Sequence, residues 1–151
     1  MRRELRFKTF DEALAELDRL EAGRVETLGV WSHAQILEHC AAAVEKSMDR
    51  FTKRAPWFIR LTLGRAAKRR ILKQGYMEAG YGDRKTERKE GDAKAAAQRL
   101  RNAIARYRTH TGPLDGHPFC GRLSRDEWDK MHLYHTANHL GFLRRTDDPA
   151  P

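Results

Sequence analysis

Three of the seven histidines lie within eight residues near the C-terminus, at positions 132, 135 and 139. An α-helix turns about 100° per residue, so the rings of His132, His135 and His139 would fall within about 60° of one another. Trp128 and Met131 lie on the same helical face, which is therefore expected to point into a protein core. An unpartnered buried polar group costs about 1–3 kcal/mol, so these rings should have partners or hold an ion.

His135 and His139 are four residues apart, so both rings can reach one point above a helix. Helices supply two metal ligands with this spacing, and neutral imidazole is a common ligand. Hydrogen-bonded packing of histidines in a core is the alternative interpretation. The glutamate of the H-E-x-x-H pattern is absent between them, so the pair gives no indication of a metalloprotease.

A third ligand would have to come from another helix, and His39 is the best candidate. It lies at the edge of the apolar face of a predicted helix, and an edge position suits a site that opens to a groove. His33 falls in the first turn of that helix, where it would pack or assist the cap. Glu38 points away from the apolar face and is expected to be solvated.

Four helices are predicted from apolar periodicity and from start signals, over about 10–21, 32–51, 92–110 and 124–143. Three of them begin with the S/T-x-x-E/Q spacing of a capping box: Thr9 with Glu12, Ser32 with Gln35, and Ser124 with Glu127. A looser helical segment covers 57–73, and 75–91 is a polar connection. No segment has the alternation of a strand.

These elements predict an all-α fold, a four-helix bundle with a long crossing segment between the second and third main helices. One domain is expected over residues 1–146, followed by a frayed tail at 147–151. The length of 151 residues is ordinary for one domain. No apolar run is long enough to span a membrane, and the start has no signal-peptide core, so we expect a cytoplasmic protein.

The two cysteines make no disulfide framework. Cys40 lies on the apolar face of its predicted helix and is expected to pack in the core. Cys120 lies in the connection before the last helix, where it could be exposed and reactive.

The whole positive excess lies in one segment. The net charge is +9, and residues 53–89 alone carry 12 Lys/Arg against 3 Asp/Glu. Five cations cluster on the predicted crossing helix, and they are candidate anion-binding residues: Arg65, Lys68, Arg69, Arg70 and Lys73. The alternative to a metal-dependent function is therefore a non-catalytic protein that uses segment 53–89 for an anionic partner, a nucleic acid or a membrane surface. No known nucleic-acid motif accompanies the cluster, which disfavours nucleic acid.

Two stretches resemble the DinB/YfiT-like superfamily. Trp31-Ser-His-Ala-Gln-Ile-Leu-Glu-His39 is similar to its W…Q…L-x-H signature, and residues 117–143 resemble one bacterial branch of it. The resemblance covers nearly the whole chain and is weakest over 53–90. It implies a DinB-like four-helix bundle with a divalent metal ion held by His39, His135 and His139. His132 matches no ligand position, and its expected role is a hydrogen bond to a ligand or a water.

Three histidine ligands leave coordination positions open, which is typical of catalytic sites. Zn²⁺ and Ni²⁺ are the first candidates, with Mn²⁺ and Fe²⁺ as alternatives. Relatives in the superfamily include transferases and isomerases that use low-molecular-weight thiols. The implied function is a metal-dependent thiol transferase or a hydrolase acting on a small molecule; homodimer formation is left open.

Overall fold

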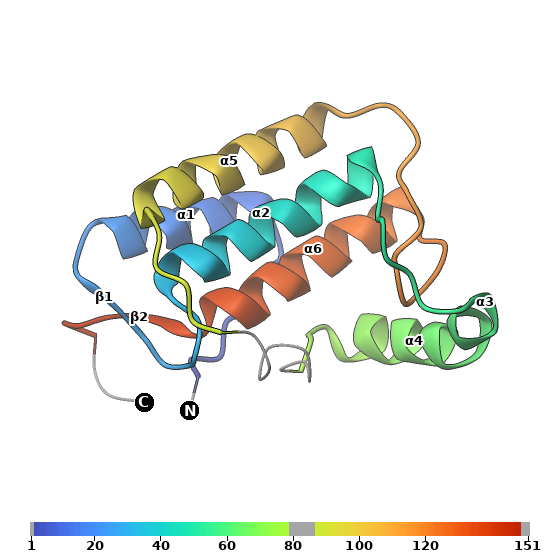
Figure 1. Ribbon diagram of the computed structural model, residues 1–151, viewed down its shortest axis with the longest axis horizontal. Helices are drawn as coiled ribbons and strands as arrows, with labels where there is room; N and C mark the ends of the chain where they lie inside the picture. The colour runs from blue at the N-terminus through green and yellow to red at the C-terminus, as the bar shows by residue number, and fades with distance from the viewer. Residues whose placement is uncertain (1, 79–86, 149–151) are drawn as a thin grey trace.

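The computed structural model describes residues 2–78 and 87–148, and most of this part of the chain is helical (Figure 1). The elements in chain order are α1 (Phe10–Glu21), β1 (Val25–Thr27), α2 (His33–Asp49), α3 (Trp57–Ile59), a π-helical turn η1 (Arg60–Gly64), α4 (Arg65–Gln74), α5 (Ala93–Thr109), α6 (Arg125–Leu140) and β2 (Leu143–Arg145). The predicted all-α class is confirmed. The predicted connection 75–91 lies partly outside the described residues.

The expected start signals do cap the helices. Ser32 and Gln35 form a complete capping box at α2, and Ser124 and Glu127 form one at α6. At α1 the side chain of Thr9 accepts a hydrogen bond from the backbone of Glu12 at 3.2 Å. These bonds satisfy amide groups that the first turn of a helix leaves without partners, so local sequence is sufficient to fix where these helices begin.

The four long helices α1, α2, α5 and α6 lie side by side (Figure 1). Helix α2 packs against α5 and α6, and α1 packs against the same two helices. Their inward faces supply most of the buried apolar residues, including Leu17, Leu37, Leu100 and Trp128. Because α2 and α6 are neighbours, the faces that carry the candidate histidines can meet.

The expectation that the chain has no strand is wrong for one short pair. β1 and β2 are antiparallel, with Val25 opposite Arg145 and Thr27 opposite Leu143. Each strand has only three residues, too few to show alternation in the sequence. The predicted last helix therefore ends earlier than expected, at Leu140.

The tail is ordered further than predicted. Asp148 forms an ion pair with Arg19 of α1 at 2.8 Å, and Asp147 pairs with Arg145. The tail was expected to fray from residue 147, but these contacts tie its first two residues to the fold. The remainder of the predicted tail, 149–151, lies outside the described residues.

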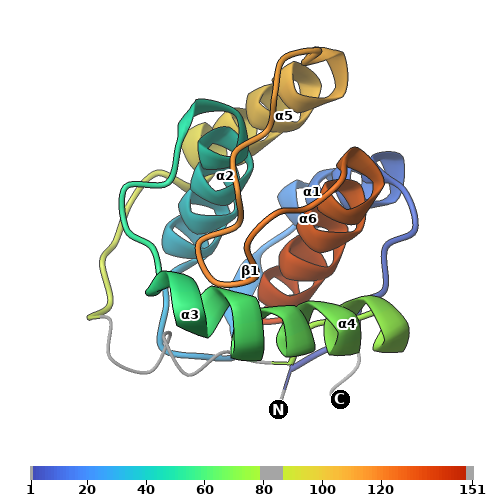
Figure 2. The ribbon, with the colours of Figure 1, turned by 90° about the vertical axis from the view of Figure 1, so that its right-hand side faces the viewer.

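The predicted crossing segment is helical from Trp57 to Gln74, through α3, η1 and α4 without a break. It runs across the long helices on one side of the molecule (Figure 2). Gly64 lies at its middle, and a Cβ atom there would be 2.1 Å from the backbone oxygen of Phe119. The glycine is needed for this close approach of helix and loop, which outweighs its weak helix propensity.

Candidate metal centre

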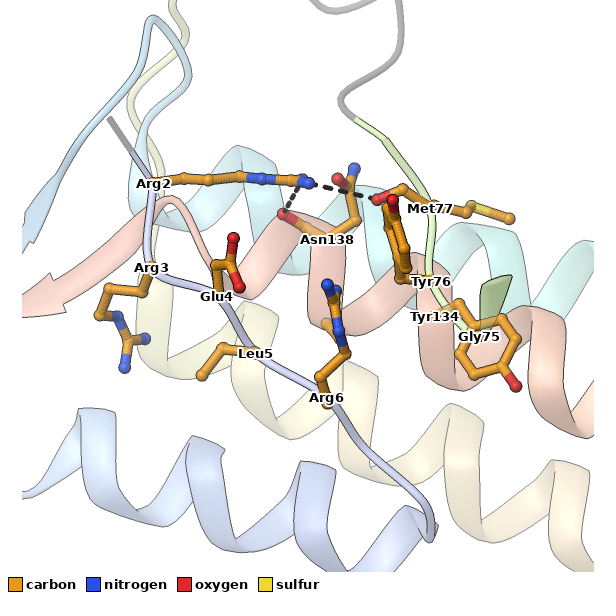
Figure 3. Close-up of a pocket in the computed structure, with 11 residues that line it drawn as sticks. Arg2, Arg3, Glu4, Leu5, Arg6, Gly75, Tyr76, Met77, Tyr134 and Asn138 are labelled. Carbon is orange, nitrogen blue, oxygen red and sulfur yellow. Dashed lines mark hydrogen bonds between the residues drawn. The ribbon is translucent and has the colours of Figure 1, made fainter. Parts of the chain in front are cut away.

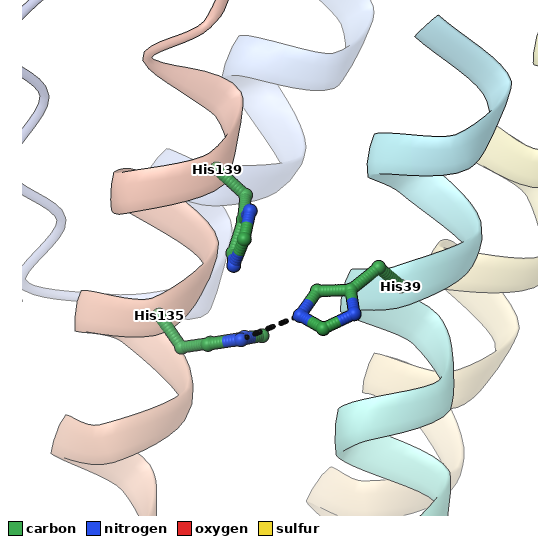
Figure 4. A group of neighbouring side chains, drawn as sticks. All are labelled: His39, His135 and His139. Atoms are coloured by element: carbon green, nitrogen blue, oxygen red, sulfur yellow. Dashed lines mark hydrogen bonds between the residues drawn. The ribbon is translucent and has the colours of Figure 1, made fainter. Parts of the chain in front are cut away.

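Three histidines from two helices converge in the structure. His39 comes from α2, and His135 and His139 come from α6 (Figure 4). Their candidate ligand nitrogens all lie within 4.8 Å of one another, and Nε2 of His39 is 3.0 Å from Nε2 of His135. The three residues selected from the sequence as metal ligands are therefore the three that the fold brings together.

The packing of α2 against α6 determines this convergence. Cys40, next to His39, is fully buried, which places His39 at the border of the core as expected. His139 is buried, whereas His39 and His135 are half-buried. The site thus has one closed side in the core and one side near the surface.

An aromatic ring closes one side of the site. The ring of Trp31 is stacked on that of His139, with centroids 5.6 Å apart, and it meets His39 edge-on at 5.0 Å. Trp31 packs against the core and also contacts two of the candidate ligands. Trp128, which was expected to face the core, is buried. Contacts of the His139 ring with Trp31, His39 and His135 limit its rotation.

Burial and crowding keep the candidate ligands neutral. Burial is the main cause that lowers the pKa of His139 to about 3, and His39 and Arg2 add to it. Burial is also the main cause that lowers the pKa of His135 well below its usual value, and the charges of His139 and His39 lower it further. A neutral imidazole keeps a lone pair on one nitrogen, which is the form that binds metal ions.

His132 is buried beside the candidate ligands and contacts α2. Its Nε2 atom lies 3.0 Å from the hydroxyl oxygen of Ser47, which itself donates to the carbonyl of Val44. The Ser47 oxygen therefore accepts from the His132 N–H. The ring also packs against Tyr107 and Trp128. The ring of His132 is thus bonded to α2, which joins α6 to that helix one turn away from His135. A hydrogen bond from His132 to a ligand or a water stays a prediction.

A cavity of about 200 Å³ adjoins the site. His39 and His135 form part of its wall, and Phe51, Trp128 and Met131 are among the apolar residues of its lining. His132 and Lys46 also line it. A small molecule in this cavity would lie against two of the three candidate ligands and against both apolar and polar side chains of the wall.

His117 is a cavity residue that the sequence did not single out. Its Nδ1 atom accepts hydrogen bonds from the backbone amides of Phe119 and Cys120, at 3.2 and 3.0 Å. Burial lowers the pKa of His117 to about 4, so the ring is neutral at pH 7 and its proton is on Nε2. It comes from a turn that has no helical periodicity, and only the fold places it beside the cavity.

A second, smaller cavity of about 110 Å³ lies on another side of α6, under the N-terminal segment (Figure 3). Arg2 donates to the backbone carbonyls of Met77 and Asn138 there, at 3.2 and 3.4 Å. The buried side-chain oxygen of Asn138 has no hydrogen-bond partner among the described residues. Asn138 therefore belongs to this cavity's lining, consistent with its position off the histidine face of α6.

Both cysteines are buried. Cys40 is in the core as expected. Cys120 is also buried, which corrects the expectation that it could be exposed, and burial raises its pKa to about 11. The thiolate form of Cys120 is therefore scarce at neutral pH.

The five predicted anion-binding cations all lie on α4. Lys68 is paired with Glu127, and Arg70 is paired with Glu78. The structure thus confirms the helix that carries the cluster, and over residues 2–78 and 87–148 it gives ion pairs to two of the five cations only. No helix in the described part of the chain is long and apolar enough to cross a membrane.

Comparison with known proteins gives one match. A family model described as a protein of unknown function (DUF1569) matches residues 1–146. Neither the curated proteins nor the solved structures contain a match.

Proposed function

Because the chain belongs to the DUF1569 family, whose description assigns no activity, we propose a function from the site itself. The protein is a divalent-metal-binding protein whose ligands are His39, His135 and His139, in a four-helix bundle of the DinB type. Its activity is that of a metal-dependent enzyme acting on a small molecule, either a transferase that uses a low-molecular-weight thiol or a hydrolase. The observation that carries the proposal is the convergence of three imidazoles within 4.8 Å.

The donor set fits a divalent ion. Imidazole nitrogen suits Zn²⁺ and Ni²⁺, and it also binds Mn²⁺ and Fe²⁺ in mixed sites. Two nitrogens that share a tetrahedral zinc ion are separated by about 3.3 Å. The distance of 3.0 Å between the Nε2 atoms of His39 and His135 is close to that value. Low pKa values at His135 and His139 keep lone pairs available at neutral pH.

A structural role for the histidines without metal is less well supported. Two neutral Nε2 atoms 3.0 Å apart can share one proton, so a hydrogen bond could account for His39 and His135. This hydrogen bond would not account for His139, whose neutral ring lies beside the other two. The ring of His139 is also buried, which costs free energy unless its nitrogens have partners. A shared ion would bind all three rings at once.

The cavity supplies the rest of the proposed site. A bound divalent ion with open positions would act as a Lewis acid toward an oxygen or a thiol. The apolar wall of Phe51, Trp128 and Met131 would exclude water and hold an apolar part of the substrate. The His117 Nε2–H is a hydrogen-bond donor in this lining, and Lys46 is its cation.

Metal content tests the proposal first. Protein without an affinity tag is analysed by mass spectrometry as purified and after incubation with Zn²⁺, Ni²⁺, Mn²⁺ and Fe²⁺. We expect about one ion per chain in the wild type and none in His135→Ala/His139→Ala. His110→Ala is the matched control, because His110 caps the far end of α5 and should leave metal content unchanged. Absence of metal under all these conditions would refute the proposal.

Activity assays then separate the two reaction types. Loss of free thiol in the presence of an electrophile, dependent on the loaded metal, would indicate the transferase. Hydrolysis of activated esters or amides without a thiol would indicate the hydrolase. His117→Gln should reduce either activity while one ion per chain remains bound, since His117 is assigned to the substrate and not to the metal.

A further inference from the structure

The crossing helix carries an unusual charge. Between Trp57 and Gln74 there are six cations and no carboxylate. Two of them have ion pairs: Lys68 lies 3.0 Å from Glu127, and Arg70 lies 2.5 Å from Glu78. Within the described part of the chain, no ion pair neutralises the other four, which are Arg60, Arg65, Arg69 and Lys73. This side of the molecule therefore has positive charge that the described residues do not balance with ion pairs.

Some of these cations surround a recess. It has a volume of about 520 Å³ and lies between the crossing helix and the loop at residues 120–122. Arg60, Arg65 and Lys68 line it from the helix, and Arg122 lines it from the loop. Its lining includes no carboxylate among the residues that the structure describes. We call this site the basic recess.

The basic recess is held by specific contacts. Lys68 is bonded to both carboxylate oxygens of Glu127, at 3.0 and 3.1 Å, and to the backbone oxygen of Arg122 at 3.4 Å. Gly64 allows the loop backbone to come within a distance that any side chain would prevent. The helix is wound as a π turn from Arg60 to Gly64, and such turns are frequent at functional sites.

Arg60 is a partly buried cation in the lining of the recess. Its Nε atom is buried and has no hydrogen-bond partner among the described residues. A buried donor without an acceptor costs about 1–3 kcal/mol, so native proteins rarely leave one unsatisfied. With a shift of the Arg60 side chain toward an anion in the basic recess, this nitrogen would gain an acceptor.

We propose that the basic recess binds a phosphate group of an organic phosphate. Guanidinium groups donate pairs of parallel hydrogen bonds to phosphate, and several cations around one recess match its three oxygens and double charge. A carboxylate has two oxygens and one charge and fits less well. Trp57 and Leu61 are apolar, 67% and 55% exposed, and they line the same recess. They would contact the organic part of the ligand.

The organic phosphate can be a soluble ester or the headgroup of a phospholipid. Other exposed apolar side chains lie close by in the sequence: Phe58 and Leu63 on the same helix and Phe119 next to the loop. Cations beside exposed Trp, Phe and Leu are typical of segments that bind anionic lipid surfaces. The two sources share the phosphate, and the experiment distinguishes them.

The soluble source is tested by titration calorimetry with phenyl phosphate, inorganic phosphate and benzoate. We expect phenyl phosphate to bind most tightly and benzoate most weakly. Arg65→Gln and Arg122→Gln should each weaken the binding of phenyl phosphate about tenfold or more, as expected for a lost charged hydrogen bond. Arg69→Gln is the matched control, because Arg69 is an exposed cation of the same helix outside the recess. Circular dichroism checks that each variant is folded.

The lipid source is tested by sedimentation with vesicles of phosphatidylcholine alone and of phosphatidylcholine with phosphatidic acid. Binding to the second vesicles only, weakened by Arg65→Gln but not by Arg69→Gln, would support a lipid phosphate. Binding of phenyl phosphate without vesicle binding would support a soluble ester. No binding in either assay would overturn the proposal. Equal losses for Arg65→Gln and Arg69→Gln would also overturn it, because they would indicate diffuse charge, as in non-specific nucleic-acid binding.

A phosphate could also bind to a metal ion at the histidines, so both assays are repeated with His135→Ala/His139→Ala. We expect the affinity for phenyl phosphate to be unchanged in this variant. If the double substitution abolished phosphate binding, the histidine site and not the basic recess would be responsible, and the proposal would be wrong.

Discussion

The Nε2 atoms of His39 and His135 lie 3.0 Å apart although 96 residues separate these histidines in the chain. The contact joins α2 to α6, and His139 of α6 completes the group. Each of the three rings comes from an ordinary helix position, and none requires strained backbone. The candidate centre is therefore a consequence of how two regular helices pack.

Loss of one ligand from α2 should weaken metal binding strongly without unfolding the protein. For His39→Ala we expect the affinity for Zn²⁺ to fall by more than about 100-fold, because two histidines of one helix remain. A fluorescent chelator in competition measures the affinity. His33→Ala, in the first turn of the same helix, is the control and should bind as the wild type does. Similar losses in both variants would contradict the assignment of His39.

The metal-free protein should lose stability as the pH falls below about 6.5. The pKa is lowered to about 4 at His117 and to about 3 at His132 and His139, mainly by burial. Unfolded histidines titrate near 6.5, so between these values the unfolded state binds more protons. Each such histidine then removes up to about 1.4 kcal/mol of stability per pH unit.

Urea denaturation at pH 7.5, 6.0 and 5.0 measures this dependence above the range in which carboxylates titrate. His117→Phe should flatten it, because one buried titrating group is removed. A free energy of unfolding that is constant over this range, or an unchanged slope in the variant, would show that the histidines are not buried as neutral rings.

Ser47→Ala should destabilise the protein by about 1–3 kcal/mol, because it leaves the buried His132 N–H without an acceptor. The free energy of unfolding in urea at pH 7.5 is the measurement. His132→Phe in the Ser47→Ala background is the control, since removing both polar partners should recover part of the loss. A neutral effect of Ser47→Ala would argue against the hydrogen bond.

Gly64→Ala should destabilise the protein although alanine favours helices by about 1 kcal/mol over glycine. The added Cβ would lie 2.1 Å from the backbone oxygen of Phe119, so helix or loop must move, at a cost of about 1–3 kcal/mol. Thermal unfolding measures the change. For comparison, Ala66→Gly at an exposed position of α4 tests propensity alone and should cost about 1 kcal/mol. A stabilised Gly64→Ala variant would mean that helix and loop are further apart.

Local signals in the sequence were sufficient to predict the four long helices and where they start. Capping residues and apolar periodicity depend on neighbours within about four residues, so the starts at Ser32 and Ser124 could be predicted within one residue. The 3.6-residue period of the helix also fixed the common face of His135 and His139. The short strands could not be predicted, because the residues that pair in them, such as Val25 and Arg145, are far apart in the chain.

The tertiary structure alone decided which distant groups meet. It placed His39 against His135, which the sequence could only suggest from an edge position on a helix and from a family resemblance. It placed His117 beside the cavity and brought His132 within hydrogen-bond distance of Ser47. Neither contact can be predicted from turn geometry or from the helical period. It buried Cys120. The physical reason is that a ligand group, a cavity or a buried thiol depends on contacts across helices, whereas a helix depends mainly on its own residues.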